Sequence, residues 1–456
     1  MGVLTLTDFL LRRWPCLDIG NETAQTAEHF PPLGAESRAV LFTILRNSVG
    51  GSYVKPIFPR LIVAIICLAF VPGAACAQLN AVYFESNIGS VTGQNSIYGF
   101  SNDGTGNLTP LPGSPYLTGG TGVFDPGGLS DSFDADQQVI TNQAGTLLFA
   151  ANGHSNNISV FTIASDGSLT PIAGSPFDSA GPDPVSLSLD ETSTPGILAV
   201  ANKGSDPNQV DGAPNYVTFF VDSTGALTPT GRVVTLAAGT SPSQVILHPT
   251  GHLMFTDDFM VHTMSTYRYT TSGAMSFLQS ASPQNGGNFL GMAINPKQPV
   301  IYAATPSPTL GRNFMSAYRY QVSSGSLTFQ SIVKNGGLAT CWIAVNAAGT
   351  KFYDSETVSN TVSVYDLTNP NKPVFQQQLA LPTGGTPVNL AVDPTQKFLY
   401  VLQDKGVKQS AAGNPVQARL LTLTINSDGT LSFLNPAIPI ILPTGETPVG
   451  IATVLK

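Results

Sequence analysis

Two nearly identical stretches, GNLTPLPGSPY at residues 106–116 and GSLTPIAGSPF at residues 167–177, decide the fold of this chain. Weaker copies of the same stretch begin at five further places, which are Gly225, Gly273, Gly325, Asn371 and Gly429. A motif that recurs at a regular interval is the signature of a repeat architecture, in which each copy belongs to one structural unit. The sequence therefore predicts seven units.

Each unit contains four strand-like segments. An alternating segment such as ISVFTIASD, from Ile158, precedes the repeated stretch, and alternation with β-branched and aromatic residues is typical of strands. Upstream lie a second strand, such as TLLFAANG from Thr146, and a small apolar strand, such as VSLSLD from Val185. Turn sequences separate the strands. Units of four strands that recur about every 52 residues indicate the blades of a β-propeller.

The two ends of the repeat array complete each other. The first unit, which begins at Ala81, has no innermost strand before it, whereas TPVGIATVL at residues 447–455 is an innermost strand without a unit. This segment resembles TPVNLAVDP at residues 386–394. The sequence thus predicts an all-β, seven-bladed propeller with four-stranded antiparallel blades. We expect the C-terminal strand to join the N-terminal blade and close the ring, which removes free sheet edges.

The composition agrees with this architecture and excludes others. The 456 residues include 45 Gly and 35 Pro, and only 11% are charged, less than half of the usual share. So many helix breakers exclude a coiled coil or helical bundle, and 42% hydrophobic residues exclude charge-driven disorder. The net charge of −8 argues against a nucleic-acid partner, which would select a basic surface.

The N-terminal part of the chain has the pattern of an export signal. LIVAIICLAFV at residues 61–71 is too short for a membrane span, which needs about 20 residues, and has the right length for the core of a signal peptide. Basic residues precede it, and ACA at residues 75–77 forms a small-x-small cleavage site before Gln78. We expect a signal peptide at residues 54–77 and a secreted or periplasmic protein that has no membrane span after cleavage.

The boundaries follow from this interpretation. Residues 1–53 are interpreted as an extension upstream of a true start near Val54, with a genuine cytoplasmic extension as the alternative, and residues 78–456 form the propeller. Lipid attachment at Cys76 is a weaker alternative to a soluble product. Cys341 is the one cysteine after Gln78, so the mature chain forms no internal disulfide.

Two repeats carry a resemblance to a known family. NGHSNNISVFTIASDGSLTPIAGSPF at residues 152–177 and SPSQVILHPTGHLMFTDD at residues 241–258 resemble the lactonase family of seven-bladed propellers. That family includes a bacterial 6-phosphogluconolactonase and the fungal 3-carboxymuconate-lactonising enzyme, and it is related to secreted YVTN-type repeat proteins. The resemblance covers nearly all of residues 80–456. It implies the propeller fold and the hydrolysis of a lactone.

The resemblance also implies a catalytic His, Arg and Glu on the funnel face of the ring. The matching positions hold Asp183 for the His, Ser243 for the Arg, and the pair Asp257-Asp258 next to Phe259 for the Glu. None of the three residue types is retained, although Asp258 lies one residue from the Glu position. Because an acidic side chain can still activate a water, Asp183 and Asp258 are the catalytic candidates.

Further candidates occupy predicted strand ends on the same face. Arg312, in the loop TPSPTLGRNF, is expected to stabilise a developing oxyanion. The other predicted ligand-binding residues share a place at the mouth of the funnel, and they are Asp257, Ser243, His154, Lys203 and Trp342. Their acid-rich neighbourhood is interpreted either as a mouth that binds a cation or polyol hydroxyls, or as a solvated rim.

No metal or cofactor is predicted. His248 and His252 flank a turn at the end of the blade opposite to His262, and a strand of several residues separates them by more than metal ligands allow. The sequence also has no G-x-S-x-G nucleophile motif and no P-loop.

Two functions remain open at this point. The first is an exported enzyme that hydrolyses or binds a non-phosphorylated lactone, with Asp183 or Asp258 activating water. The second is a non-catalytic propeller of the cell envelope that binds glycan or protein partners. We expect a monomer in either case. Convergence of Asp183, Asp258 and Arg312 on one pocket would favour the enzyme.

Overall fold

A computed structural model of the chain describes ten segments. They are residues 78–88, 94–123, 135–206, 209, 212–307, 312–383, 385–404, 418–434, 440–442 and 447–456. The predicted signal peptide and N-terminal extension lie outside these ranges. No helix within the ranges is long and apolar enough to cross a membrane.

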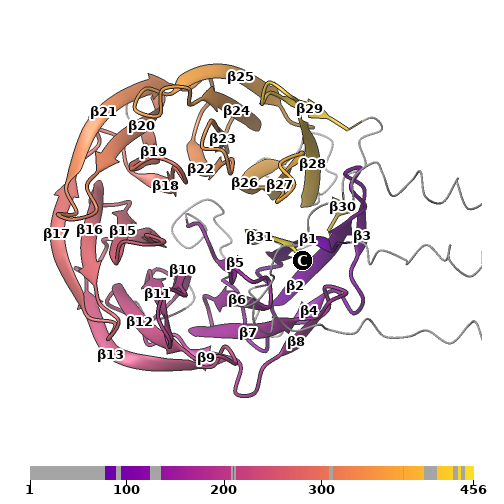
Figure 1. Cartoon of the computed structure of the whole chain (residues 1–456), viewed down its shortest axis with the longest axis vertical. Coiled ribbons are helices and arrows are strands. Elements are labelled where there is room, and N and C mark those ends of the chain that lie inside the picture. The colour runs from indigo at the N-terminus through magenta and orange to yellow at the C-terminus, as the bar shows by residue number, and fades with distance from the viewer. Residues whose placement is uncertain are drawn as a thin grey trace, which may run out of the picture. The chain divides into compact units, whose positions relative to one another are not determined.

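The described residues of Gln78–Lys456 form seven antiparallel sheets arranged in a ring (Figure 1). From the innermost strand outward, blade 1 contains β31 (Val449–Leu455), β1 (Asn80–Glu85), β2 (Ser96–Asn102) and β3 (Leu108–Pro110), with β4 (Tyr116–Leu117) beside β2. Blade 2 contains β5 (Val139–Thr141), β6 (Leu147–Asn152), β7 (Asn157–Ile163) and β8 (Leu169–Pro171), with β9 (Phe177–Asp178) beside β7. Blade 3 contains β10 (Pro184–Asp190), β11 (Gly196–Asn202), β12 (Asn215–Val221) and β13 (Leu227–Thr235).

The remaining four blades follow the same order. Blade 4 contains β14 (Pro242–Leu247), β15 (Leu253–Asp258), β16 (Thr263–Tyr269) and β17 (Met275–Ala281), and blade 5 contains β18 (Leu290–Ile294), β19 (Val300–Ser307), β20 (Arg312–Tyr320) and β21 (Leu327–Lys334). Blade 6 contains β22 (Thr340–Val345), β23 (Lys351–Glu356), β24 (Thr361–Asp366) and β25 (Val374–Ala380). Blade 7 contains β26 (Thr386–Val392), β27 (Phe398–Asp404), β28 (Arg419–Ile425) and β29 (Leu431–Phe433), with β30 (Ile440–Ile441) beside β28.

The predicted all-β fold with seven four-stranded blades is confirmed. β31, from the C-terminus, pairs antiparallel with β1, from the N-terminal blade, so that Ala81 lies opposite Val454 and Tyr83 opposite Ala452. In blades 3, 4 and 5 a β-bulge follows the first residue of the innermost strand. In blade 4, for example, Pro242 pairs with Asp258 and Gln244 with Asp257, which leaves Ser243 bulged.

The hydrophobic core is divided among the interfaces between neighbouring blades. Within the described ranges one buried cluster lies between each adjacent pair, including the pair of blades 7 and 1, where Tyr400 and Leu402 pack against Val82 and Phe84. Burying a large apolar side chain contributes about 1.5–3 kcal/mol. The interfaces are therefore the main source of stability, and they explain why the repeated apolar residues dominate the sequence pattern.

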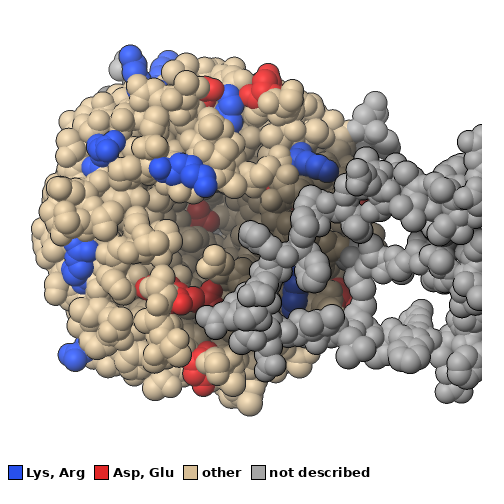
Figure 2. All heavy atoms as spheres, viewed as in Figure 1, with Lys and Arg blue, Asp and Glu red and all other residues tan. Residues whose placement is uncertain are grey.

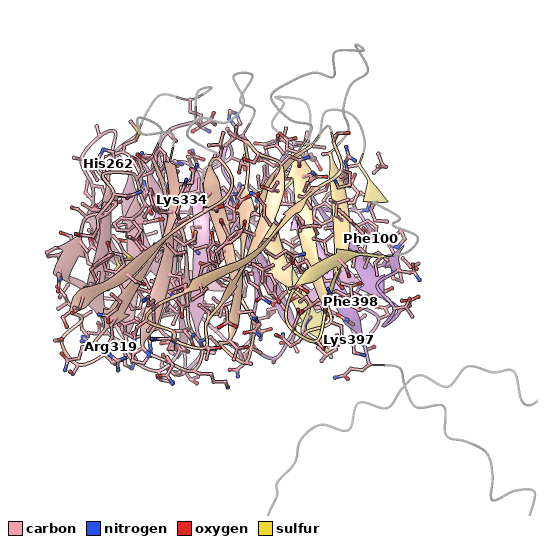
Figure 3. All side chains as sticks on the ribbon, turned by 90° about the horizontal axis from the view of Figure 1, so that it is seen from above. Phe100, His262, Arg319, Lys334, Lys397 and Phe398 are labelled. Atoms are coloured by element: carbon pink, nitrogen blue, oxygen red, sulfur yellow. The ribbon has the colours of Figure 1, made fainter. Side chains whose placement is uncertain are left out.

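The ring has two distinct ends. We call upper face the end at which the innermost strands begin and the second strands finish, and lower face the opposite end. Figure 3 shows His262 and Lys334 at the upper face and Arg319 and Lys397 at the lower face. His248 lies in a lower-face turn, where its Nδ1 accepts the N–H of Thr250. Figure 2, which views the ring from the lower face, shows a hollow in the middle of the ring with acidic side chains in it, while most visible Lys and Arg side chains lie around it.

Candidate functional site

The backbone at the upper face adopts an uncommon conformation. Within two residues of the start of an innermost strand, a non-glycine residue has a positive φ in four blades, and these residues are Gln137 (67°), Asp183 (55°), Ser241 (57°) and Ala339 (57°). The left-handed region costs free energy for residues with a Cβ, and such residues gather at functional sites. The upper face therefore has the backbone conformation expected at a functional site.

Asp183 is held rigidly directly before β10. Its N–H donates to Asn156 Oδ1 at 2.8 Å, and its carbonyl accepts the N–H of Lys203 at 2.8 Å. The carboxylate is 1% exposed. Its Oδ2 accepts long hydrogen bonds from Ser205 at 3.3 and 3.4 Å, whereas Oδ1 has no partner in the described ranges. Burial raises the pKa of Asp183 to about 6, and the charge of Lys203 limits the rise.

Lys203 joins Asp183 to Asp257. Lys203 directly follows β11 in blade 3, and it is 2% exposed. Its charge lowers the pKa of Asp183 and also that of Asp257, in β15 of the next blade. A buried ammonium group that acts on two carboxyl groups places these three side chains in one electrostatic cluster. The charge of Lys203 therefore links Asp183 and Asp257 electrostatically.

Asp257 has the most unusual environment of the three. Its side chain is fully buried, and neither carboxylate oxygen forms a hydrogen bond of normal geometry with the described residues. Burial, together with the charge of Asp258, raises the pKa of Asp257 to about 8, although the Gln244 amide and Lys203 lower it in part. Asp257 is thus a neutral acid at pH 7. A buried polar side chain without a partner is rare unless a ligand or water completes it.

Asp136 is a member of the cluster that the sequence pattern did not single out. It lies before β5, and its charge raises the pKa of Asp257. Burial raises its own pKa to about 7. Asn389 Nδ2 donates to Asp136 Oδ1 at 3.0 Å. The available signal was the connection between β4 and β5, residues 118–138, because a connection well above the usual length of about 2–6 residues is often functional.

His154 reaches the cluster through a second acid. Its Nδ1 lies 2.6 Å from Asp206 Oδ2, and the charge of Asp206 contributes to the raised pKa of Asp183. The His154 side chain is 28% exposed whereas Asp206 is buried. Of the predicted ligand-binding residues, His154 therefore connects the buried cluster to solvent.

Other predicted residues point elsewhere. Asp258 accepts a hydrogen bond from Tyr216 Oη at 2.7 Å, across the interface of blades 3 and 4, and lies near Thr263. Burial raises its pKa to about 6. Successive side chains of a strand point to opposite faces, which explains why the neighbouring Asp257 and Asp258 have different surroundings.

The remaining candidates are Ser243, Trp342 and Arg312. Ser243 is fully buried, and its hydroxyl lies 3.5 Å from the carbonyl of Ser241. Trp342 is 3% exposed and packs in a small apolar cluster with Leu290 and Cys341, against Phe259. Arg312 begins β20, and its side chain lies outside the described part of the structure. The predicted convergence of Asp183, Asp258 and Arg312 on one pocket therefore stays a prediction.

The cluster can perform acid–base chemistry. It contains carboxyl groups with pKa values of about 6, 7 and 8 next to one buried ammonium group. Titratable groups whose pKa values are pushed apart supply an acid and a base at the same pH. In the described ranges no group of three or more His, Cys, Asp or Glu side chains is arranged to hold a metal ion.

Comparison with known proteins finds relatives in structure. No protein-family model matches the sequence, and no curated protein matches it. Among solved structures, candidate 6-phosphogluconolactonases from Bacteroides fragilis and Bacteroides uniformis superpose with TM-scores of 0.60 at 18% and 16% identity; the matches cover 84% and 82% of this chain and 99% of theirs. The periplasmic gluconolactonase PpgL of Pseudomonas aeruginosa superposes with a TM-score of 0.59 at 13% identity, over 83% of this chain and 99% of that one.

These neighbours define the class of the chain by its fold. It is a seven-bladed β-propeller of the architecture found in lactonase-type propellers, and the predicted resemblance to them is confirmed at that level. With identities below 20%, the likeness concerns the fold alone. What the chain does has to be argued from its own site.

Proposed function

We propose that this protein binds and hydrolyses a non-phosphorylated lactone at the upper-face cluster of Asp183, Lys203 and Asp257. Each of these three residues has a distinct role. Asp183 is the general base, Asp257 is the general acid, and Lys203 stabilises the negative charge that develops on the carbonyl oxygen. This assignment gives the acid role to Asp257 and leaves Asp258 to its contact with Tyr216.

The proposed reaction is a hydrolysis with water as the only co-reactant. The ionised carboxylate of Asp183 takes a proton from water while the water oxygen bonds to the lactone carbonyl carbon. The carbonyl electrons move to oxygen, and the resulting oxyanion lies near the Lys203 ammonium. When the tetrahedral intermediate collapses, the ring C–O bond breaks, and the neutral carboxyl of Asp257 protonates the leaving alkoxide. The product is a hydroxy acid, and transfer of the proton from Asp183 to Asp257 restores the site.

One observation carries the proposal, namely that no hydrogen bond of normal geometry reaches the buried carboxyl of Asp257 within the described ranges. A carboxyl group that served only the fold would be paired, because leaving a buried polar group unpaired costs about 1–3 kcal/mol. The corresponding positions of blades 3 and 5, opposite Ser186 and Met292, hold Ala201 and Ala303. An acid at this position is therefore not required to build a blade, although blade 6 also holds one, Asp354, opposite Ile343.

The proposal is tested with the purified protein and a panel of lactones. The panel contains aldonolactones, their 6-phosphorylated forms and aromatic lactones, and the measurement is hydroxy-acid release above the uncatalysed rate. We expect turnover of an unphosphorylated lactone that Asp257→Asn lowers by about 100-fold or more. Asp222→Asn, in an exposed lower-face turn, is the matched control and retains activity. Equal rates for wild type and Asp257→Asn would overturn the proposed role.

The same experiment addresses the non-catalytic alternative. If no lactone is hydrolysed, calorimetry with neutral oligosaccharides and with the lactone panel reports binding directly. If the protein binds a ligand without turnover and Asp257→Asn abolishes this binding, the protein is a binding protein that uses the same cluster and not an enzyme.

We also propose that the protein is exported. The support is the apolar run at residues 61–71 and the cleavage pattern before Gln78. Expression with a C-terminal tag, followed by N-terminal sequencing of the extracytoplasmic protein, tests this. A mature chain that starts near Gln78 is expected, and a product confined to the cytoplasm with residues 61–71 intact contradicts it.

A further inference from the structure

The four residues before β5, residues 135–138, cross the central channel. In Figure 1 the chain that leads into β5 lies near the middle of the ring. Leu187 of blade 3 donates its N–H to the carbonyl of Gln137 at 3.0 Å, and Asp136 donates its N–H to the carbonyl of Ser243 in blade 4 at 3.2 Å. The Asn389 side chain of blade 7 donates to the carboxylate of Asp136 at 3.0 Å. The segment thus connects innermost strands from different sides of the ring.

Side chains extend these connections to further blades. Gln244 Nε2 donates to Gln137 Oε1 at 2.9 Å and to the carbonyl of Met292 in blade 5 at 3.1 Å. Asn389 Oδ1 accepts the N–H of Gly450, in β31 of blade 1, at 2.7 Å. Through the segment and these two amide side chains, the innermost strands of blades 1, 3, 4, 5 and 7 are linked across the channel.

The segment is also packed as part of the interior. Ala135 is fully buried and belongs to the core between blades 3 and 4, with Val185 and Val245. The Gln138 carbonyl accepts the N–H of Ala151, which returns the chain to blade 2. A connection between adjacent blades needs none of these distant contacts, since it has only to join one outer strand to the next innermost strand. Their presence calls for a role beyond connection.

We propose that residues 135–138 form a plug that closes the central channel at the level of the upper-face cluster, and that Asp136 is the residue that positions this plug. A ligand of the cluster then rests against residues 135–138. Asp136 positions the plug by two contacts, through its N–H to Ser243 on one side of the ring and through its carboxylate to Asn389 on the other.

Hydrogen exchange of individual amides tests the plug without any lactone, so the result is independent of the proposed hydrolysis. The full chain is compared with Asp136→Ala, which removes the acceptor for Asn389, and with Asp136→Asn, which keeps an oxygen in its place. The reporter is the Leu187 amide, whose acceptor is the plug. The internal control is the His248 amide, which donates to Leu253 at the lower face at 2.7 Å and reports opening of the whole ring.

We expect Asp136→Ala to speed exchange of the Leu187 amide by about tenfold or more relative to His248, and Asp136→Asn to restore protection. Asn389→Ala, which leaves the plug sequence intact, is the second variant and should expose Leu187 in the same way if Asp136→Ala fails to fold. Unchanged protection of Leu187 in both Asp136→Ala and Asn389→Ala overturns the proposal. Equal acceleration at Leu187 and His248 also overturns it, because the change is then a loss of overall stability rather than release of a plug.

Discussion

The two ends of the innermost strands use polar residues in opposite ways. At the lower face the strands finish in side chains that accept backbone N–H groups of the following turn, and these are Asn142, Asp190, His248, Asn295, Asn346 and Asp393. At the upper face, Asp183 Oδ1 and both oxygens of Asp257 have no hydrogen-bond partner in the described ranges. The hydrogen-bonded arrangement at the lower face recurs from blade to blade, whereas the arrangement of polar side chains at the upper face does not.

This difference separates residues that build the ring from residues available for chemistry. A paired polar group contributes about 0.5–1.5 kcal/mol to stability, whereas a buried group left unpaired costs about 1–3 kcal/mol. The lower-face residues therefore stabilise the fold. The upper-face acids oppose it, which is expected of a site whose groups are completed by a ligand. Substitutions at the two ends should therefore differ in how they change stability.

The largest effect is expected from removing the buried cation of the upper face. Lys203→Met leaves the carboxyl groups of Asp183 and Asp257 without a charge that lowers their pKa values. Breaking a buried ionic cluster by removing one member costs about 3–5 kcal/mol. We expect urea unfolding at pH 7 to show a loss of this size. The loss should shrink at pH 5, where a larger share of these carboxyl groups is neutral.

The matched lower-face variant is Lys351→Met. Lys351 Nζ lies 2.7 Å from Asp366 Oδ2, but Asp366 is 34% exposed. A solvent-exposed pair contributes only about 0–1 kcal/mol. Similar losses for Lys203→Met and Lys351→Met would show that the upper-face cluster is not energetically distinct.

The second effect has the opposite sign, because Asp257→Asn should stabilise the protein at high pH. The pKa of Asp257 is about 8 when folded and 3.8 ordinarily, so the folded state binds the proton more tightly, and the wild type loses stability as pH rises between these values. The variant lacks this loss. We expect a gain in the free energy of unfolding of about 2 kcal/mol at pH 8 and none at pH 4, well inside the ceiling of about 1.4 kcal/mol per pKa unit.

Asp190→Asn is the control for that experiment. Asp190 accepts hydrogen bonds from the Thr192 N–H and Tyr269 Oη, both at 2.8 Å. We expect it to lower stability, because the amide replaces one of the acceptor oxygens. A pH-dependent gain at Asp190, or a loss of stability for Asp257→Asn at pH 8, contradicts the assignment of the two ends.

The sequence predicts the ring far better than it predicts the site, and the reason is repetition. Lines such as GSLTPIAGSPF recur, so each blade confirms the others. The residues of the candidate site, in contrast, do not recur from blade to blade. Asp183, Lys203 and Asp257 were predicted at the funnel, but their grouping depends on side-chain direction, and the bulge at Ser243 shifts the register of β14 against β15. Asp136 was missed because its segment crosses the channel, and no periodic pattern encodes such a crossing.

A third effect concerns the space around Asp183. A Cβ on Gly153 would lie 2.8 Å from Asp183 Oδ1 and 2.6 Å from Val123 Cγ2. Overpacking of this kind typically costs about 1–3 kcal/mol. We expect Gly153→Ala to lower stability by about 1 kcal/mol and to lower kcat/KM by about tenfold or more, because the carboxylate must move.

Gly251 offers the lower-face counterpart. A Cβ there would lie 2.6 Å from Val322 Cγ1 and 2.9 Å from His248 Nδ1. Gly251→Ala should therefore cost similar stability and leave kcat/KM unchanged. If both alanines lowered kcat/KM equally, the effect of Gly153→Ala would reflect general destabilisation and not the position of Asp183.

The smallest effect is expected at a single turn of the lower face. Asn346 Oδ1 accepts the N–H groups of Thr350 and Lys351 at 2.8 and 3.0 Å. Asn346→Ala removes both hydrogen bonds at a site open to water, so we expect a loss of about 1 kcal/mol in thermal unfolding. Asn346→Asp keeps an acceptor and should retain most of that stability. Lactone turnover should be unchanged in both variants, because the turn only ends an innermost strand. A fall in kcat at Asn346 would mean that the two ends of the ring are coupled, and the division between structural and functional polar residues would then fail.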